Sequence, residues 1–167
     1  MRFEKRILDE KLTIVIIMPH FGLIDDSLVQ AEASLLRARL HIRGGLIRLS
    51  EGRLEDGVAA FYDALVYAML THFDSQELRN NLSIHKDDDL NDDRTLFLIL
   101  KRSGVIDSSV DISDFDYLYR KMDEAIEDEL IEFDAHQFMH RFNRIMVTLG
   151  TIPFDENDLP KGNPVTL

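Results

Sequence analysis

The sequence contains no cysteine, which excludes disulfide bonds, thiolate metal sites and cysteine nucleophiles. Only four prolines are present and three of them follow residue 150, so long helices are permitted over most of the chain. The apolar run Leu12–Met18 is far shorter than the roughly 20 residues of a membrane span. It also ends in Pro19 and His20, unlike a signal peptide. We therefore expect a cytoplasmic protein without a membrane anchor.

Positive charge is also scarce. The chain has 19 Lys and Arg against 31 Asp and Glu, a net charge of −12, which disfavours binding of nucleic acid by bulk electrostatics. The charges are segregated: residues 33–53 carry five arginines and one acid, whereas residues 105–135 carry eleven acids and two bases. Such asymmetry predicts oppositely charged helix faces that meet within the molecule or across a homodimer. The expected partner is thus a second copy or another protein, and self-association should weaken as salt rises.

The length of 167 residues and the hydrophobic content of 45% fit one domain with a sizeable core. We place this domain at residues 1–150 and predict that residues 151–167 form an extended or partly disordered tail. No strand pair and no repeat is evident. The fold class is therefore all-α, with about five helices.

Helical spacing predicts an antiparallel hairpin in the middle of the chain. Apolar residues at three- and four-residue steps give one stripe over residues 28–49 and another over residues 54–73, joined by a turn at Gly52. Phe61, Leu65 and Leu35 are predicted core residues. The Gly44–Gly45 pair inside the first helix predicts close approach of a neighbouring helix, because glycine otherwise weakens a helix.

Further helices are predicted on both sides of the hairpin. Residues 3–17 have helical spacing, and Asp26 or Ser27 is expected to cap the first hairpin helix. After a polar loop, Asp92 or Asp93 caps a helix that stops at Gly104. A long C-terminal helical stretch is then expected over residues 115–149, with a kink or break near Asp128–Glu129 because about 35 residues is long for one helix. Its predicted seam consists of Ile131, Ala135, Phe138, Phe142, Ile145 and Leu149.

The stretch "LLRARLHIRGGLIRLSEGRLEDGVAAFYDALVYAMLTHF", residues 35–73, resembles the first helical hairpin of HEPN domains. The order of elements that follows, loop, shorter helix, loop and long helix, is similar too. The resemblance implies a HEPN-like all-α bundle that forms dimers. Part of the same stretch also resembles one tetratricopeptide unit, which would imply an adaptor protein, but a single unit is present where at least three are needed.

Many HEPN proteins are metal-independent ribonucleases with an Arg, a polar residue and a following His. "RNNLSIH" supplies Arg79, Asn80 and His85. In the family this motif lies at or near the start of the fourth helix, whereas here it lies before the predicted third helix. The histidine would accept the 2′-hydroxyl proton and the arginine would hold the phosphate. The alternative is that these are polar loop residues. We expect Arg79 and His85 to be exposed and the protein not to cut single-stranded RNA.

Two further sets of residues are candidate binding sites. Glu132, His136 and His140 share one face if residues 115–149 are helical, which suits a zinc ion, although ordinary pairing along the helix explains them too. In the first hairpin helix, Arg37, His41 and Arg48 form a stripe for a phosphate group or a partner. The alternative to a binding site is that these residues form a solvated helix face that pairs with the acidic residues of the long C-terminal helix.

The leading prediction is a non-catalytic HEPN-like domain that acts through helix–helix association and needs no cofactor. The alternative function is a metal-independent ribonuclease that uses Arg79 and His85. The third possible function is that of a tetratricopeptide-like adaptor.

Overall fold

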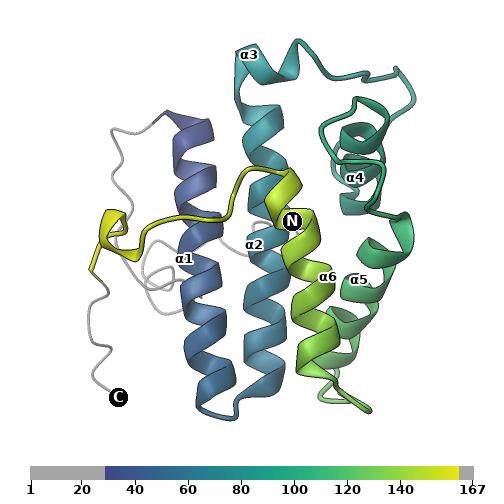
Figure 1. The fold of residues 1–167 in the computed structure, drawn as a ribbon. Coiled ribbons are helices and arrows are strands. Elements are labelled where there is room, and N and C mark those ends of the chain that lie inside the picture. Colours follow the sequence, from purple (N-terminus) through teal and green to yellow (C-terminus); the bar gives the residue numbers. More distant parts are fainter. Residues whose placement is uncertain (1–28, 162–167) are drawn as a thin grey trace, which may run out of the picture.

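The structure is a computed structural model that describes residues 29–161. The predicted helix over residues 3–17 and the predicted cap at Asp26 or Ser27 lie outside the described residues. Within them the chain is all-α, as predicted, and no strand is present (Figure 1). The helices are α1 (Gln30–Ser50), α2 (Leu54–Asp74), α3 (Gln76–Arg79), α4 (Asp93–Arg102), α5 (Ile112–Ile126), α6 (Ala135–Thr148) and the 3-10 turn η2 (Glu156–Asp158).

The predicted antiparallel hairpin is confirmed. Helices α1 and α2 have 21 residues each and run side by side in opposite directions (Figure 1). The turn between them passes through Gly52, whose φ of +75° is a conformation that side chains with a Cβ rarely adopt. The two long apolar faces thereby pack against each other over the whole hairpin.

Gly45 lies where the two hairpin helices approach most closely. A Cβ placed on Gly45 would lie only 2.9 Å from the ring of Phe61, and a Cβ on Gly57 would lie 3.4 Å from the Gly45 carbonyl oxygen. The predicted close approach of a neighbouring helix, here α2, is therefore confirmed for Gly45 of the glycine pair. The cost of a helical glycine is offset by the fully buried ring that occupies the space.

Helix α2 is the centre of the bundle, since it contacts α1, α4, α5 and α6. Phe61 and Leu65 are fully buried, as predicted, whereas Leu35 is only half-buried. The Phe61 ring meets the rings of Phe142 and Phe138 of α6 edge-on, at centroid distances of 5.0 and 6.0 Å. Such contacts between aromatic rings add to the free energy of burial.

The predicted stretch over residues 115–149 is not one helix: α5 ends at Ile126 and α6 begins at Ala135, so of the two expected interruptions near Asp128–Glu129 the break is the one present. In the connection Asp128 and Glu132 adopt left-handed φ angles of 54° and 48°. The Asp134 side chain then accepts a hydrogen bond from the Gln137 amide and caps a new helix. Of the predicted seam, Phe138, Phe142, Ile145 and Leu149 are buried, but Ile131 and Ala135 are exposed.

The shorter helices have clear local causes. Asp92 caps α4 through the Thr95 amide, and the chain leaves this helix at Gly104, as predicted. Helix α3 was not predicted: Ser75 caps it through the Leu78 amide, but it makes a single turn.

None of the described helices combines the length and the apolar character that a membrane crossing needs.

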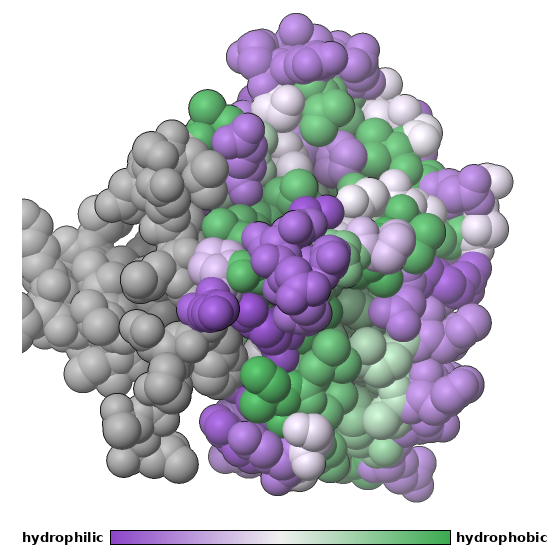
Figure 2. Space-filling view, turned by 60° about the vertical axis from the view of Figure 1, so that its left-hand side comes forward, coloured by the Kyte–Doolittle hydropathy of each residue, from purple (hydrophilic) through white to green (hydrophobic). Residues whose placement is uncertain are grey.

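The segment 151–161 leaves the top of α6 and crosses α1 (Figure 1). Arg39 donates a hydrogen bond to the Thr151 carbonyl oxygen (3.1 Å), and Arg43 donates one to the Pro160 carbonyl oxygen (2.7 Å). The guanidinium of Arg39 also lies over the Phe154 ring, and Leu159 is buried. In Figure 2, which brings this side forward, hydrophilic side chains form a patch across the middle with hydrophobic surface above and below.

Candidate functional site: an arginine–aspartate network between α5 and α6

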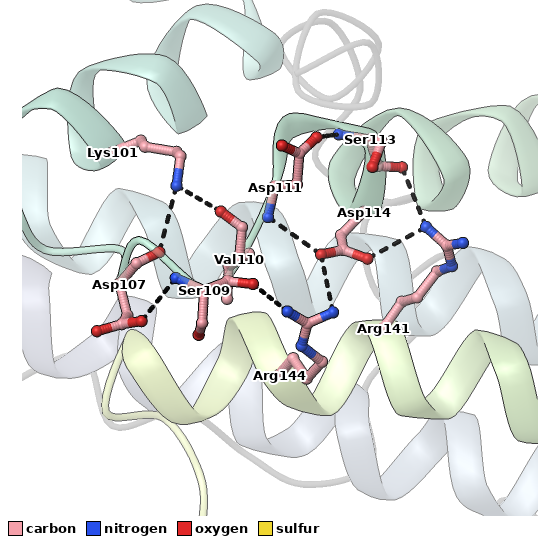
Figure 3. A network of polar contacts seen from close by, with 9 residues as sticks. All are labelled: Lys101, Asp107, Ser109, Val110, Asp111, Ser113, Asp114, Arg141 and Arg144. Carbon is pink, nitrogen blue, oxygen red and sulfur yellow. Dashed lines mark hydrogen bonds and ion pairs between the residues drawn. The ribbon is translucent and has the colours of Figure 1, made fainter.

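Asp114 lies at the centre of a polar network that joins α4, α5 and α6 (Figure 3). Its carboxylate is almost fully buried. Oδ1 accepts a hydrogen bond from Arg141 Nη1 (3.1 Å), and Oδ2 lies 3.3 Å from Arg144 Nη1. Oδ2 also accepts from the Asp111 amide (3.2 Å), which completes a capping box at the start of α5.

The network continues into the loop between α4 and α5 (Figure 3). Arg144 donates to the Ser109 carbonyl oxygen, and Lys101 Nζ donates to the carbonyl oxygens of Asp107 and Val110. Arg141 donates to the Ser113 carbonyl oxygen (3.4 Å). Three cationic side chains thus join α4, α5 and α6 around one loop.

The arrangement favours structural stability over acid–base chemistry. Both oxygens of Asp114 already have partners, two guanidinium groups and the Asp111 amide, and the carboxylate is almost fully buried, so it is placed to hold the helices together. The charges of the network balance, since three cations, Lys101, Arg141 and Arg144, lie among three carboxylates, those of Asp107, Asp111 and Asp114.

Two open pockets flank the network. The larger, of about 520 Å³, has His140, Arg144 and Asp107 in its wall, and the smaller, of about 290 Å³, has Arg120 and Arg141. Neither of these two pockets is lined by Arg79 or by His85.

The candidate ribonuclease residues lie on the surface at the end of α3 and in the loop after it. Arg79, Asn80 and His85 are all exposed. The Arg79 side chain donates to the Phe73 carbonyl oxygen (3.4 Å), and Asn80 accepts from Gln76. The backbone amide of His85 is bound by Asp88 (2.6 Å). The exposure agrees with our prediction, and the described contacts of these residues are local ones.

The proposed metal ligands do not share a helix face. Glu132 lies in the connection before α6, with a left-handed φ, whereas His136 and His140 lie on α6. All three are exposed, and no group of three potential metal ligands occurs among residues 29–161. The helical geometry on which the zinc prediction depended is therefore absent, because the Asp134 cap begins a new helix after Glu132.

The arginine stripe of α1 is divided among several environments. His41 is buried, lies 3.8 Å from Asp63 and stacks on Tyr67, so it is not part of an open surface. Arg37 lies over the same Tyr67 ring. Arg48 is half-buried, and desolvation lowers the pKa of its guanidinium.

Sequence reasoning missed the residues of the network and those that hold the C-terminal segment. Arg39 and Arg43 are four residues apart on α1, and Arg141 and Arg144 are three apart on α6. This spacing puts each pair on one face and was the available signal. Their partners lie 27 to 117 residues away in the sequence, where no local pattern indicates them.

Comparison with known proteins gave no match: no family model, no curated protein and no solved structure is similar to this chain at a significant level.

Proposed function

We propose that this chain is a non-catalytic, HEPN-like helical domain that acts by associating with a second copy of itself through α5. The observation that carries the proposal is an apolar stripe on α5 that the rest of the described chain covers only in part. Tyr119 and Ile126 are 42% and 54% exposed, and Met122 between them is half-buried. Ile131, in the connection to α6, is 66% exposed.

The spacing of the stripe suits a helix partner. Tyr119, Met122 and Ile126 stand at positions i, i+3 and i+7, so they follow one another along a single side of the helix. A two-fold axis near Met122 would place Tyr119 of one copy against Ile126 of the other, twice in each dimer. A second copy would therefore cover Tyr119, Met122 and Ile126 through one contact that occurs twice in the dimer.

The charged residues of α1 contribute less to this association than the sequence suggested. Arg39 and Arg43 bind the C-terminal segment, and Arg53 pairs with Glu51 and Asp56 across the hairpin turn. An apolar contact between two acidic copies should persist or strengthen when salt screens their repulsion. This replaces the expectation that self-association weakens with salt.

The test is a charged substitution in the stripe. Ile126→Glu should raise the dissociation constant of the dimer roughly tenfold or more, because a carboxylate within an apolar contact costs over about 1.4 kcal/mol. Val147→Glu is the matched control: Val147 is 57% exposed but lies near the far end of the antiparallel α5–α6 pair. If sedimentation gives the same dissociation constant for the two variants, α5 is not the dimer interface.

The alternatives gain no support from the described residues. Nothing in the surroundings of Arg79 and His85 favours the ribonuclease. The 21-residue helices α1 and α2 together exceed the 34 residues of a tetratricopeptide unit, which argues against the adaptor.

A further inference from the structure

The smaller pocket, between the first half of α5 and the middle of α6, has an unusual set of cations. Its volume is about 290 Å³, and Ser113, Asp116, Tyr117, Arg120 and Arg141 form its wall. It is separate from the apolar stripe, because Arg120 lies on the side of α5 that faces α6 and Ile126 lies on the other.

The Tyr117 ring positions the cations of this pocket. The guanidinium carbon of Arg141 lies 4.7 Å from the ring centroid, that of Arg120 lies 5.7 Å away, and Lys121 Nζ lies 6.0 Å away. Cation–π attraction at these distances holds the charged groups around one nearly buried ring. The guanidinium of Arg141, which Asp114 also holds, is thus set before any ligand arrives, and that of Arg120 is kept near it.

Arg120 and Arg141 have N–H donors that are not used in hydrogen bonds within the described chain. Arg141 uses only Nη1 for its hydrogen bonds to Asp114 and Ser113. Arg120 donates no hydrogen bond to any described residue; its closest carboxylate, on Glu124, lies 3.9 Å away, and its side chain is 65% exposed. A guanidinium has five N–H donors, so most of those on Arg120 and Arg141 face the pocket and solvent.

The local charge is positive although the chain is strongly acidic. Two arginines, Arg120 and Arg141, and one acid, Asp116, line the pocket, and Asp116 is already paired with Arg94 at 2.9 Å. The lining side chains therefore carry an excess of one positive charge, which attracts anions.

We infer that this pocket binds an oxyanion, a phosphate or a carboxylate, between Arg120 and Arg141. A guanidinium edge presents two parallel N–H groups whose spacing matches two oxygens of either group, which gives charge-assisted bonds. Arg141 is a fixed donor because Asp114 holds it, and Arg120 is the adjustable one.

The experiment follows the Nε–Hε signals of the arginines by NMR in the full chain. Inorganic phosphate and acetate are titrated separately, with chloride keeping the ionic strength constant. The signals of Arg120 and Arg141 should move and saturate while that of Arg53 stays still. A larger response to phosphate identifies phosphate esters as the ligand class, and a larger response to acetate identifies acidic side chains.

A variant pair makes the test specific. Arg120→Gln should weaken binding about tenfold and leave the fold intact, since the side chain is largely exposed. Arg53→Gln, the same change at the exposed hairpin turn, should leave binding unchanged. Equal binding by the two variants, or uniform, unsaturated shifts of all arginine signals, would overturn the site.

Discussion

At the scale of single residues, Gly45 shows how a local preference is overruled by packing. Alanine is the better helix former by about 1 kcal/mol. Its methyl group, however, would overlap the buried Phe61 ring, which α6 prevents from moving. Overpacking a core costs roughly 1–3 kcal/mol, so the packing penalty should win.

We therefore predict that Gly45→Ala lowers the free energy of unfolding, by up to about 2 kcal/mol after the gain in helix propensity. Urea unfolding measures the loss. In a Phe61→Leu background, where the space is larger, the same substitution should cost less. A loss of equal size in both backgrounds would show that the ring contact is not the cause.

Asp63 gives a prediction about pH. Burial raises the pKa of its carboxyl to about 6, although the side chain is 30% exposed. Between about pH 4 and pH 6 the folded state then holds more protons at this position than the unfolded state, so its contribution to stability falls as pH rises. Asp63→Asn should remove this contribution. Parallel pH profiles of unfolding free energy for the two proteins would contradict the assignment.

At the scale of elements, the junction of α5 and α6 depends on one carboxylate. Asp114→Asn replaces a buried carboxylate by a neutral amide opposite Arg141 and Arg144, whose side chains are 27% and 36% exposed, and should lower the free energy of unfolding by roughly 1.5–3 kcal/mol, the range for hydrogen bonds to charged groups. Asp116→Asn is the control, since its pair with Arg94 is about half exposed on both sides and should contribute under about 1 kcal/mol. Similar losses in the two variants would show that the network does not hold the junction.

Element boundaries were predictable only where the chain carries a local signal that was recognised. Apolar spacing located the hairpin, and Asp92 with Gly104 located α4. The same type of signal, Asp134 followed by Gln137, ends the supposed long helix but was read as part of a continuous seam. Ile131 shows the consequence: it matches the period of a helix that is not there and is exposed instead.

At the scale of the whole molecule, the fold class followed from composition and periodicity, but the site did not. The pairs Arg141–Asp114 and Arg39–Thr151 join residues that only the folded chain brings together. Charge segregation predicted that the basic face of α1 would meet the acidic residues 105–135, but no ion pair among the described residues joins the two. Two partners of the α1 arginines, Thr151 and Pro160, are instead backbone carbonyls of the C-terminal segment, which sequence charge counting cannot detect.

The central claim is that the chain associates with itself through an apolar contact on α5. Sedimentation equilibrium of the unaltered protein at tens of micromolar, in about 0.05 M and 0.5 M sodium chloride, tests it most directly. The account predicts twice the chain mass of 19.3 kDa at both salt concentrations, with association at least as strong in the higher one. A mass of one chain under both conditions would contradict it.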